Sequence, residues 1–345
     1  MRAARIHGYT SDPGNAFTIE DVEAPQIAAP DDVIVDVEAA GWCHTDNHIV
    51  EGALEEMQEG LLPYTPGHEN AGTVAAVGDA VTQVSPGDSV VVHPAMSCGK
   101  CRACRLGQDM HCPEHVFVGL DTDGGFAEQL RTKERSLITL DSLDPVQAAP
   151  HADAGITAYR AVKQAAADLT PVDYTVLIGI GGLGHIGLQA LHAISATKTI
   201  AVDVKEDALR LADRHGADVT INAAEEDVPA VISDITDGQG VRKIIDFVGN
   251  EQTFGYSPAI IQTGADHHVV GYEGMLNLPA AAMIPTELDF RGTLVGTYPE
   301  LQELIELAER GLVEVAYSTH DLGDINDIAA RLHHGEVEGR AIFTP

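Results

Sequence analysis

The most constraining feature of the sequence is the stretch VLIGIGGLGHIG, residues 176–187. An apolar segment leads directly into Gly179, Gly181 and Gly184, which have G-x-G-x-x-G spacing, and a helical pattern follows. Glycines suit these positions because the turn is tight, the backbone must come close to a pyrophosphate, and the helix must pack closely on the strand. Backbone N–H groups of the turn, including those of Gly182 and Leu183, would face the phosphates. The stretch therefore predicts a strand, turn and helix that bind a dinucleotide.

The chain after this turn alternates between apolar strand patterns and helical patterns. Strand patterns occur at 173–180, 198–204, 217–223, 241–249 and 267–272, and helical patterns occur at 184–194 and 206–216. Such alternation is typical of a doubly wound parallel sheet. We place this dinucleotide-binding domain at residues 155–291 and expect two further helices and a short strand in the tail.

Asp203 lies at the end of the strand that follows the glycine turn, 19 residues after Gly184. A carboxylate at this point can accept hydrogen bonds from both ribose hydroxyls of the adenosine half of the cofactor, and it would repel a 2′-phosphate. We therefore expect NAD in preference to NADP. The alternative is that Asp203 caps the next helix, and both roles can hold together.

The first 150 residues have a different pattern of expected secondary structure. Short strand patterns at 31–41, 71–78, 87–94 and 124–130 are broken by Gly, Pro and Asp. This spacing predicts a small β barrel or sandwich-like unit, so the whole chain is expected to be an α/β protein with a β-rich domain and a doubly wound domain. The N-terminus lacks a signal-peptide pattern, and no apolar run reaches about 18 residues, so we expect a cytoplasmic protein.

The charge is strongly unbalanced, with 53 acidic and 20 basic residues and a formal net charge of -33. This charge opposes binding to nucleic acid or to an anionic membrane. It also destabilises the compact state unless counterions screen it, and the screening length falls from about 10 Å in 0.1 M salt to about 3 Å in 1 M. We expect a host with a very salty cytoplasm, as in halophilic microbes. The alternative is a merely acidic protein from an ordinary cytoplasm.

Four of the five cysteines form a C-x2-C-x2-C-x7-C pattern in a lobe at about residues 93–115, comprising Cys98, Cys101, Cys104 and Cys112. Four thiolates suit tetrahedral zinc in a closed structural site. Because proline follows the last cysteine, an iron–sulfur cluster is an alternative, although the x7 gap departs from ferredoxin spacing. Free thiols are a further alternative.

Basic residues within this lobe keep one more interpretation open. Lys100, Arg102 and Arg105 would support a zinc module that binds nucleic acid. The net charge of the chain opposes that interpretation.

The stretch GWCHTDNH, residues 41–48, is followed by GHE at 67–69, then by the four-cysteine lobe, then by the glycine turn. In this order the motifs resemble the zinc-dependent alcohol dehydrogenases of the medium-chain dehydrogenase/reductase superfamily, over essentially the whole chain. The resemblance implies a GroES-like catalytic domain, at residues 1–154 and 292–345, and a Rossmann domain that binds NAD. Together with the charge, it leads us to expect a halophilic archaeon as the source.

In that family a cysteine, a histidine and a third ligand hold a catalytic zinc, and the fourth position is open. Cys43 matches the cysteine and His68 matches the histidine. The third ligand is usually a cysteine, but the matching position in PHADAGITAY is Asp153. A carboxylate is an acceptable zinc ligand at about 2.0 to 2.2 Å. Glu69 matches an alternate fourth ligand of the family, and His151 is a rival for the third position.

The same resemblance assigns roles to other residues of the turn. Thr45 would carry the substrate proton, through the nicotinamide ribose, to His48 at the surface. His44 matches a basic position near the cofactor pyrophosphate, and Arg340 matches a second pyrophosphate contact. Asp46 would accept a hydrogen bond from the ligand histidine and fix its tautomer.

The reaction implied by the resemblance is the reversible oxidation of an alcohol to an aldehyde or ketone, with hydride passing to NAD and zinc acting as a Lewis acid. Ala95 and Phe117 match positions that line the substrate pocket, while Trp42 is expected in the core. A polyol, sugar or formaldehyde-type dehydrogenase is the alternative on the same scaffold. A non-catalytic protein that binds zinc and nucleotide is a remote one.

Assembly is also inferred from the resemblance. Members of the family are dimers or tetramers, and we expect a homotetramer in preference to a dimer. The apolar segment 267–285 is expected at the interface between subunits.

Overall fold

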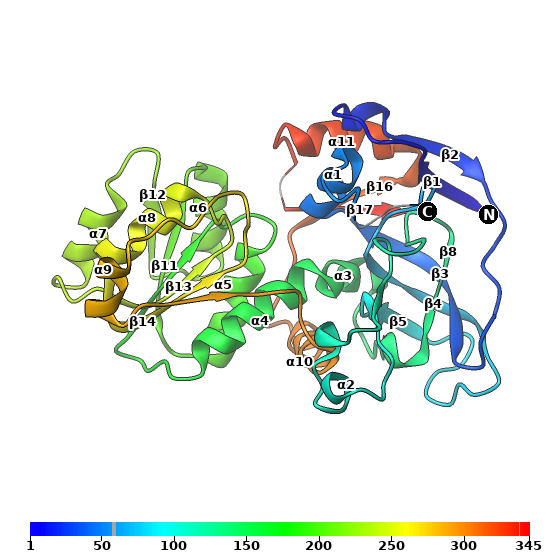
Figure 1. Cartoon of the computed structure of the whole chain (residues 1–345), viewed down its shortest axis with the longest axis horizontal. Helices are drawn as coiled ribbons and strands as arrows, with labels where there is room; N and C mark the ends of the chain where they lie inside the picture. Colours follow the sequence, from blue (N-terminus) through cyan, green and yellow to red (C-terminus); the bar gives the residue numbers. More distant parts are fainter. Residues whose placement is uncertain (57–59, 338) are drawn as a thin grey trace. The chain divides into compact units, whose positions relative to one another are not determined.

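The computed structural model describes residues 1–56, 60–337 and 339–345, and the chain divides into two compact units (Figure 1). The first unit comprises Met1–Ile156, Thr297–Glu309 and Val315–Pro345, and the second comprises Thr157–Gly296 and Arg310–Glu314. The sequence-based domain boundaries, after residues 154 and 291, stay a prediction, and they did not include the short return segment Arg310–Glu314. That segment belongs to the second unit because the Gln189 side chain hydrogen-bonds both backbone groups of Glu314, at 2.8 and 2.9 Å.

The first unit contains most of the short strands. Its strands are β1 Arg2–Ile6, β2 Phe17–Asp21, β3 Asp32–Gly41, β4 Glu69–Val77, β5 Ser89–Val92, β6 Ala95–Met96, β7 Val116–Phe117, β8 Gln129–Lys133, β9 Leu137–Thr139, β16 Tyr317–Asp321 and β17 Arg340–Thr344. Its helices are α1 His44–Glu51, α2 Arg102–Arg105, α3 Pro145–Ala148, α10 Tyr298–Glu309 and α11 Ile325–His333, with short 3-10 turns at Pro13–Asn15, Asp109–His111, Glu134–Ser136, Ala149–Ala152 and Leu322–Asp324.

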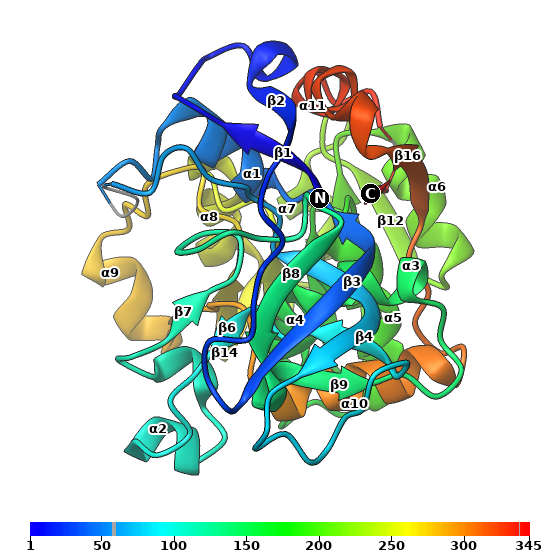
Figure 2. The ribbon, with the colours of Figure 1, turned by 90° about the vertical axis from the view of Figure 1, so that its right-hand side faces the viewer.

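A seven-stranded sheet organises this unit, in the order β16, β17, β3, β4, β5, β9, with β8 also paired to β3. Figure 2 shows β3, β4 and β8 side by side. The sheet packs on an aromatic core in which Trp42 stacks on Phe126 at 5.6 Å and meets Phe343 edge-on at 6.1 Å. Trp42 is 2% exposed, as expected of a core residue. The core thus fixes the backbone immediately before Cys43.

The strand predicted at 124–130 is wrong, because β8 begins only at Gln129. The glycines before it pack instead on the loop that carries His68. Gly124 N donates to Thr65 O at 2.7 Å and Gly125 N donates to Gly67 O at 2.9 Å. A Cβ on Gly125 would lie 1.7 Å from Asn70 Oδ1, so only glycine permits this approach.

The second unit has the elements expected of a doubly wound domain. Its strands are β10 Tyr174–Ile178, β11 Lys198–Asp203, β12 Val219–Asn222, β13 Val241–Asp246, β14 Ile261–Val269 and β15 Asp289–Gly292. Its helices are α5 Gly184–Ile194, α6 Glu206–Arg214, α7 Val228–Ile235, α8 Glu251–Ile260 and α9 Ala280–Met283, with a 3-10 turn at Ile284–Thr286. Helix α4, Ala154–Ala166, connects the two units.

All six strands of this sheet are parallel, in the order β12, β11, β10, β13, β14, β15. The chain starts at β10, moves outward to β12, and returns to β13 on the other side of β10. Helix α5 contacts α6, and α7 contacts α8. Right-handed crossovers place these two pairs on opposite faces of the sheet. The point between β10 and β13 is therefore the topological switch point, where doubly wound folds bind their ligands.

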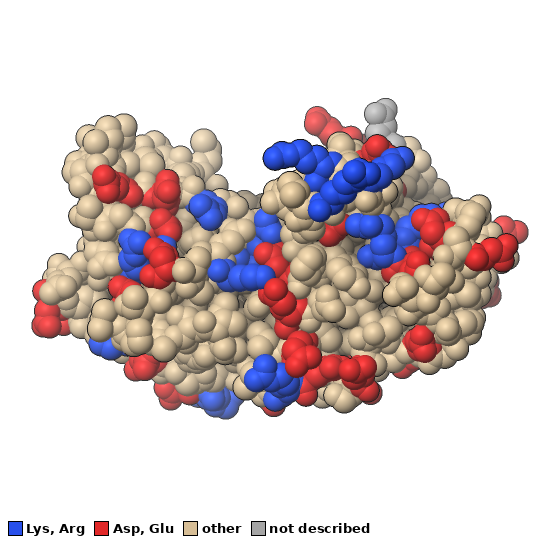
Figure 3. Space-filling view, turned by 90° about the horizontal axis from the view of Figure 1, so that it is seen from below, with Lys and Arg blue, Asp and Glu red and all other residues tan. Residues whose placement is uncertain are grey.

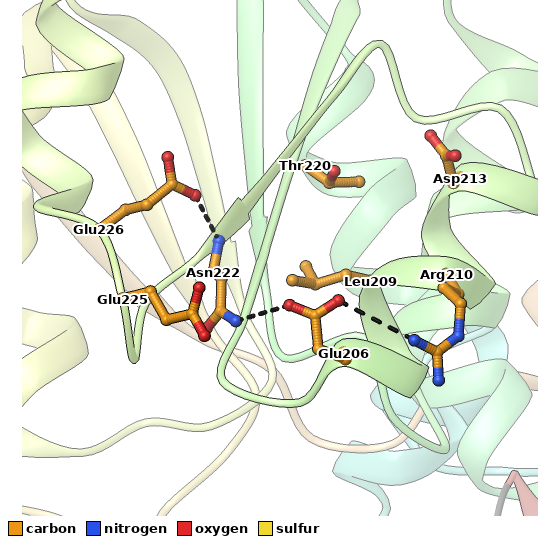
Figure 4. A pocket seen from close by; sticks show the side chains of 8 residues that line it. All are labelled: Glu206, Leu209, Arg210, Asp213, Thr220, Asn222, Glu225 and Glu226. Carbon is orange, nitrogen blue, oxygen red and sulfur yellow. Dashed lines mark hydrogen bonds and ion pairs between the residues drawn. The ribbon is translucent and has the colours of Figure 1, made fainter.

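A surface pocket lies beside α6 and the outer strand β12 (Figure 4). Its lining residues are Glu206, Leu209, Arg210, Asp213, Thr220, Asn222, Glu225 and Glu226. Asn222 Nδ2 donates to Glu206 at 2.8 Å, and Arg210 lies 3.9 Å from the same carboxylate. None of the described residues predicted to bind the cofactor lines this pocket, although Asn222 pairs with Asp203 in the register of β11 and β12.

Within the described part of the chain, no helix combines the length and the apolar character needed to cross a membrane.

His268, on β14, gives the second unit a pH-dependent stability. It is 1% exposed, and neither ring nitrogen has a hydrogen-bond partner among the described residues. Burial lowers the pKa of His268 to about 4, with Asp266 opposing the shift and Lys243 adding to it. As the pH falls, His268 takes up a proton at about pH 6.5 in the unfolded chain but only at about pH 4 in the folded chain. Stability is therefore lost as the pH falls below about 6.5.

We expect His268→Leu to reduce this loss. Between about pH 7 and pH 5 the free energy of unfolding should fall by about 2 kcal/mol less in the variant than in the unsubstituted protein. Denaturant unfolding in concentrated KCl at the two pH values measures the difference. The exposed His334→Gln variant is the control and should behave as the unsubstituted protein does. An unchanged pH dependence in His268→Leu would contradict the assignment.

Candidate active site and metal centres

The start of α1 presents the first predicted ligand. Cys43 is the residue before the helix, in an extended conformation, and Asp46 Oδ2 accepts its backbone N–H at 2.8 Å. Cys43 Sγ lies 3.7 Å from Thr45 Oγ1. The first turn of α1 therefore holds Cys43 rigidly at the edge of the aromatic core.

Cys43, His68 and Asp153 form one cluster, in which a ligand atom from each residue lies within 4.8 Å of the others. His68 Nε2 is 3.4 Å from Asp153 Oδ2. The three residues are 7%, 2% and 8% exposed and come from segments far apart in the sequence. Three donors of sulfur, nitrogen and oxygen type match a zinc site that keeps a fourth position open.

The charges of the cluster also fit a divalent cation. Burial raises the pKa of the Cys43 thiol, and the Asp153 carboxylate raises it further. Burial alone would lower the pKa of His68, but the carboxylates of Asp46 and Asp153 raise it well above its ordinary value. Burial opposes ionisation of Asp153, yet its hydrogen bond with His68 lowers its pKa. These directions favour a protonated thiol and imidazole without metal, so Zn²⁺ would displace both protons on binding. The resulting thiolate, carboxylate and neutral imidazole would carry two negative charges, which Zn²⁺ balances.

Glu69, the first residue of β4, contacts the segment that carries Asp153. It is fully buried, and its Oε1 accepts hydrogen bonds from Arg340 Nη2 and from Ala154 N, the latter at 3.1 Å. Its Oε2 has no hydrogen-bond partner among the described residues. The bond to Ala154 fixes the backbone directly after Asp153. Glu69 is outside the group of three ligand atoms, and its role as an alternate ligand stays a prediction.

Arg340 is 6% exposed and forms an ion pair with Glu69. The pair explains why an arginine is tolerated in the interior, since a buried charge requires a partner. The sequence-based role of Arg340 at the cofactor pyrophosphate stays a prediction.

The four cysteines of the lobe form a second cluster, again with sulfur atoms within 4.8 Å of one another. Cys104 Sγ lies 3.5 Å from that of Cys101 and 3.9 Å from that of Cys98, and none of the cysteines is in a disulfide. Backbone N–H groups of Cys98 and Cys104 point at cysteine sulfurs at 3.5 Å. Four such sulfurs fit a closed tetrahedral zinc site.

Sequence reasoning missed the network that anchors this lobe. Asp109 is 4% exposed and accepts hydrogen bonds from Ser97 Oγ at 2.9 Å and from Arg135 Nη2 at 2.8 Å. Arg135 Nε also donates to Ser97 at 3.0 Å. The only sequence signal was that Asp109 is an acidic residue between Cys104 and Cys112. Its partner Arg135 lies 26 residues later in the chain.

The glycine turn of the second unit uses each glycine differently. Gly179 has a φ of 84°, which favours glycine, and a Cβ on Gly184 would lie 1.9 Å from the Gly179 carbonyl oxygen. A Cβ on Gly181 would meet nothing within 4 Å, so the fold itself does not require a glycine there, and its role in the approach of a pyrophosphate stays a prediction. His185 Nδ1 lies 2.7 Å from Gly181 O, a contact that the sequence did not predict.

Asp203 lies at the carboxyl end of β11, beside this turn. Its Oδ2 accepts a hydrogen bond from Ile180 N at 2.7 Å and its Oδ1 accepts one from Lys205 N at 2.9 Å. The N-cap residue of α6 is Lys205, so the alternative that Asp203 caps the helix is wrong. Each oxygen keeps lone pairs for a further donor, as the predicted ribose contact requires.

Comparison with known families decides the identity. Residues 29–142 match the alcohol dehydrogenase GroES-like domain, and residues 182–310 match the zinc-binding dehydrogenase domain. The NAD-dependent alcohol dehydrogenase of Sulfurisphaera tokodaii is 35% identical over the full length of both chains. The chain belongs to the zinc-type alcohol dehydrogenase family.

Two further relatives extend the comparison. The solved structure of the alcohol dehydrogenase from the hyperthermophilic archaeon Aeropyrum pernix matches with a TM-score of 0.94 and 45% identity over all of both chains. The D-arabinose 1-dehydrogenase (NADP(+)) of Saccharolobus solfataricus is 35% identical over 95% of this chain and 94% of its own. The fold expected from the sequence, a GroES-like domain and a Rossmann domain, is confirmed.

Within this alcohol dehydrogenase fold, Asp46 lies beside His68, with 3.5 Å between Oδ1 and Nδ1. That separation is long for a hydrogen bond, and neither atom has a hydrogen-bond partner among the described residues. The predicted hydrogen bond stays a prediction. His151 is buried but lies outside the ligand group, with its ring against Gly155 of α4.

The predicted relay residues lie together on α1. His44 is exposed, while Thr45 and His48 are half-buried, and the rings of His44 and His48 are 4.9 Å apart. The relay and pyrophosphate roles stay predictions.

The two predicted pocket residues lie opposite each other on a short ladder. Ala95 of β6 pairs with Phe117 of β7. The Phe117 ring is 6.2 Å from the His68 ring, which places this ladder beside the metal cluster. Both side chains are buried, with 2% and 8% exposure.

Proposed function

We propose that the protein catalyses the reversible oxidation of primary or secondary alcohols to aldehydes or ketones, with NAD as cofactor and with one catalytic and one structural zinc per chain. The observation that carries the proposal is the buried cluster of Cys43, His68 and Asp153, which has the donors and the charge for zinc but only three ligands. An open fourth position is what distinguishes a catalytic zinc site from a structural one.

The residues of the chain would divide the work as follows. Cys43, His68 and Asp153 would hold the catalytic zinc, and the four cysteines of the lobe would hold the structural zinc. When bound, zinc supplies Lewis acidity to the substrate oxygen and NAD accepts the hydride. Thr45 and His48 would move the hydroxyl proton toward solvent, because both lie on α1 directly after the ligand cysteine. Asp46 would orient His68.

The Rossmann unit would bind NAD. The glycine turn at Gly179, Gly181 and Gly184 offers backbone N–H groups to the pyrophosphate, with His44 and Arg340 as basic contacts. Asp203 would accept the ribose hydroxyls and disfavour NADP. One relative, the D-arabinose 1-dehydrogenase, is named for NADP(+). The proposed preference for NAD should therefore be tested by assaying both cofactors.

The D-arabinose relative supports the alternative of a sugar or polyol dehydrogenase on the same scaffold. A panel of short, branched, aromatic and polyhydric alcohols, assayed with NAD and with NADP in concentrated KCl, separates these functions. We expect NADH formation, with branched or aromatic alcohols accepted because Ala95 is small. Activity confined to ethanol would count against the wider pocket, and activity confined to sugars with NADP would overturn the proposed function.

Association into a homotetramer, in preference to a dimer, is supported by an exposed apolar segment of the second unit. Tyr272, Met275 and Ile284 are 66%, 76% and 75% exposed. They belong to the segment that connects β14 to β15, the outer strand of the sheet, whose far edge has no partner strand among the described residues. A monomeric mass in concentrated KCl would contradict this proposal.

A salty cytoplasm, as in a halophilic archaeon, remains part of the proposal. It is supported by the net charge of -33. On the face drawn in Figure 3, acidic side chains form several separate groups with basic side chains between them.

A further inference from the structure

A fully buried carboxylate lies at the carboxyl end of β13. Asp246 is 0% exposed, and its Oδ1 accepts hydrogen bonds from the backbone N–H groups of Val248 and Gly249, both at 2.9 Å. Its Oδ2 accepts one from Thr253 Oγ1 of α8 at 2.5 Å. Asp246 therefore ties the loop between β13 and α8 to the end of its own strand.

A histidine and a serine complete this network. His267 of β14 is 0% exposed, and its Nε2 lies 3.3 Å from Asp246 Oδ2 while its Nδ1 lies 2.6 Å from Ser257 Oγ of α8. A neutral imidazole that donates from Nε2 to the carboxylate accepts the serine hydroxyl at Nδ1, so both ring nitrogens are used. The network links β13, α8 and β14 without reaching the surface.

The environment keeps Asp246 ionised. Burial alone would raise the pKa of its carboxyl, but hydrogen bonds from His267, from Thr253 and from the loop backbone lower it. An anion with this number of donors holds its partners more strongly than a neutral acceptor would.

The loop that Asp246 holds packs on the glycine turn. Phe247 N donates to Ile178 O, at the end of β10, at 2.9 Å. A Cβ on Gly179 would lie 2.7 Å from Val248 Cγ2, and a Cβ on Gly187 would lie 2.7 Å from the Phe247 ring. Strands β10 and β13 flank the switch point of the sheet. Residues 247–249 therefore line the same edge as the turn that is proposed to bind pyrophosphate.

We infer that Asp246, supported by His267 and Ser257, is a positioning residue for the dinucleotide: it fixes the loop 247–249 against the glycine turn and so sets the affinity for NAD(H). The inference rests on the proposed function, because it needs NAD(H) to bind at the glycine turn. Asp246 and His267 are buried, so they act through the loop and not by contact with the cofactor.

The test measures NADH binding by fluorescence, without turnover, in concentrated KCl. For Asp246→Asn we expect the Kd for NADH to rise about tenfold, because the amide no longer accepts all of its donors. The KM for NAD should rise similarly, while kcat changes less than about threefold, because the chemistry in the first unit is untouched. Ser257→Ala, which leaves the carboxylate and its backbone bonds in place, should weaken NADH binding about two- to threefold.

Thr175→Val is the matched control. Thr175 of β10 is 0% exposed and shares a hydrogen bond of 3.1 Å with Thr197, at the opposite, amino-terminal edge of the same sheet. It should lower the melting temperature but leave the Kd for NADH within about twofold. Unchanged binding in Asp246→Asn, or equal weakening in Thr175→Val, would overturn the inference alone.

Two further outcomes are decisive. If Asp246→Asn does not fold, Ser257→Ala decides, and binding equal to that of the unsubstituted protein would overturn the inference. If the unsubstituted protein binds neither NADH nor NADPH, both the proposed function and the inference fail.

Discussion

Replacing Asp153 with asparagine is expected to remove the catalytic zinc and to lower kcat/KM for alcohol oxidation by about a thousandfold or more. The amide has almost the same shape but no charge, so it is a much weaker zinc ligand than a carboxylate. The cluster would be left with two ligands, Cys43 and His68. Metal analysis should show one zinc fewer per chain, and the four-cysteine site serves as an internal reference for the remaining zinc.

Asp153→Cys is the matched variant, because the third zinc ligand of the family is usually a cysteine. A thiolate is a softer ligand than a carboxylate, so we expect this variant to keep its zinc and to stay within about tenfold of the original kcat/KM. Full zinc content and activity in Asp153→Asn would contradict the assignment of the third ligand. Loss of zinc in both variants would show that the position tolerates no change.

Transfer from about 2 M to about 0.1 M KCl is expected to destabilise the protein strongly. At low salt the acidic side chains, 53 against 20 basic ones, repel one another with little screening. We expect a loss of about 5 kcal/mol, which for a chain of 345 residues corresponds to about 7 °C in melting temperature. Thermal unfolding followed by circular dichroism at both salt concentrations measures it.

The control for this prediction separates screening of charge from general stabilisation by solutes. Sucrose strengthens burial because it is excluded from protein surfaces, but it does not screen charge. Added to the low-salt sample, it should restore only part of the melting temperature. Equal melting temperatures at low and high salt would contradict a salt-adapted protein.

Local patterns predicted the second unit well, because its signals lie within each element. Helix α5 spans Gly184–Ile194, the range indicated by the sequence, because the glycine turn fixes its start. Strand β14 was predicted only at 267–272, whereas it spans Ile261–Val269. Its first half contains Gly264 and polar residues, and the register with β13 shifts there, from Val241 paired with Ile261 to Lys243 paired with Asp266.

The cluster of Cys43, His68 and Asp153 could be proposed as a zinc site from the sequence only because the motifs resemble a family. The spacing of Cys43, His68 and Asp153 along the chain carries no geometric information, since β3, β4 and the turn before α4 bring the three together. The partner of Arg340 is a contact of this kind: Glu69 is 271 residues away, and no local pattern connects the two. The network of Asp246, His267 and Ser257 was missed for the same reason.

The most direct test combines metal analysis with a cofactor assay on the same preparation, kept in concentrated KCl. The proposed function requires two zinc ions per chain, one for each cluster, and formation of NADH with at least one primary or secondary alcohol. One zinc ion per chain, together with no reduction of NAD or NADP by any alcohol, would contradict it.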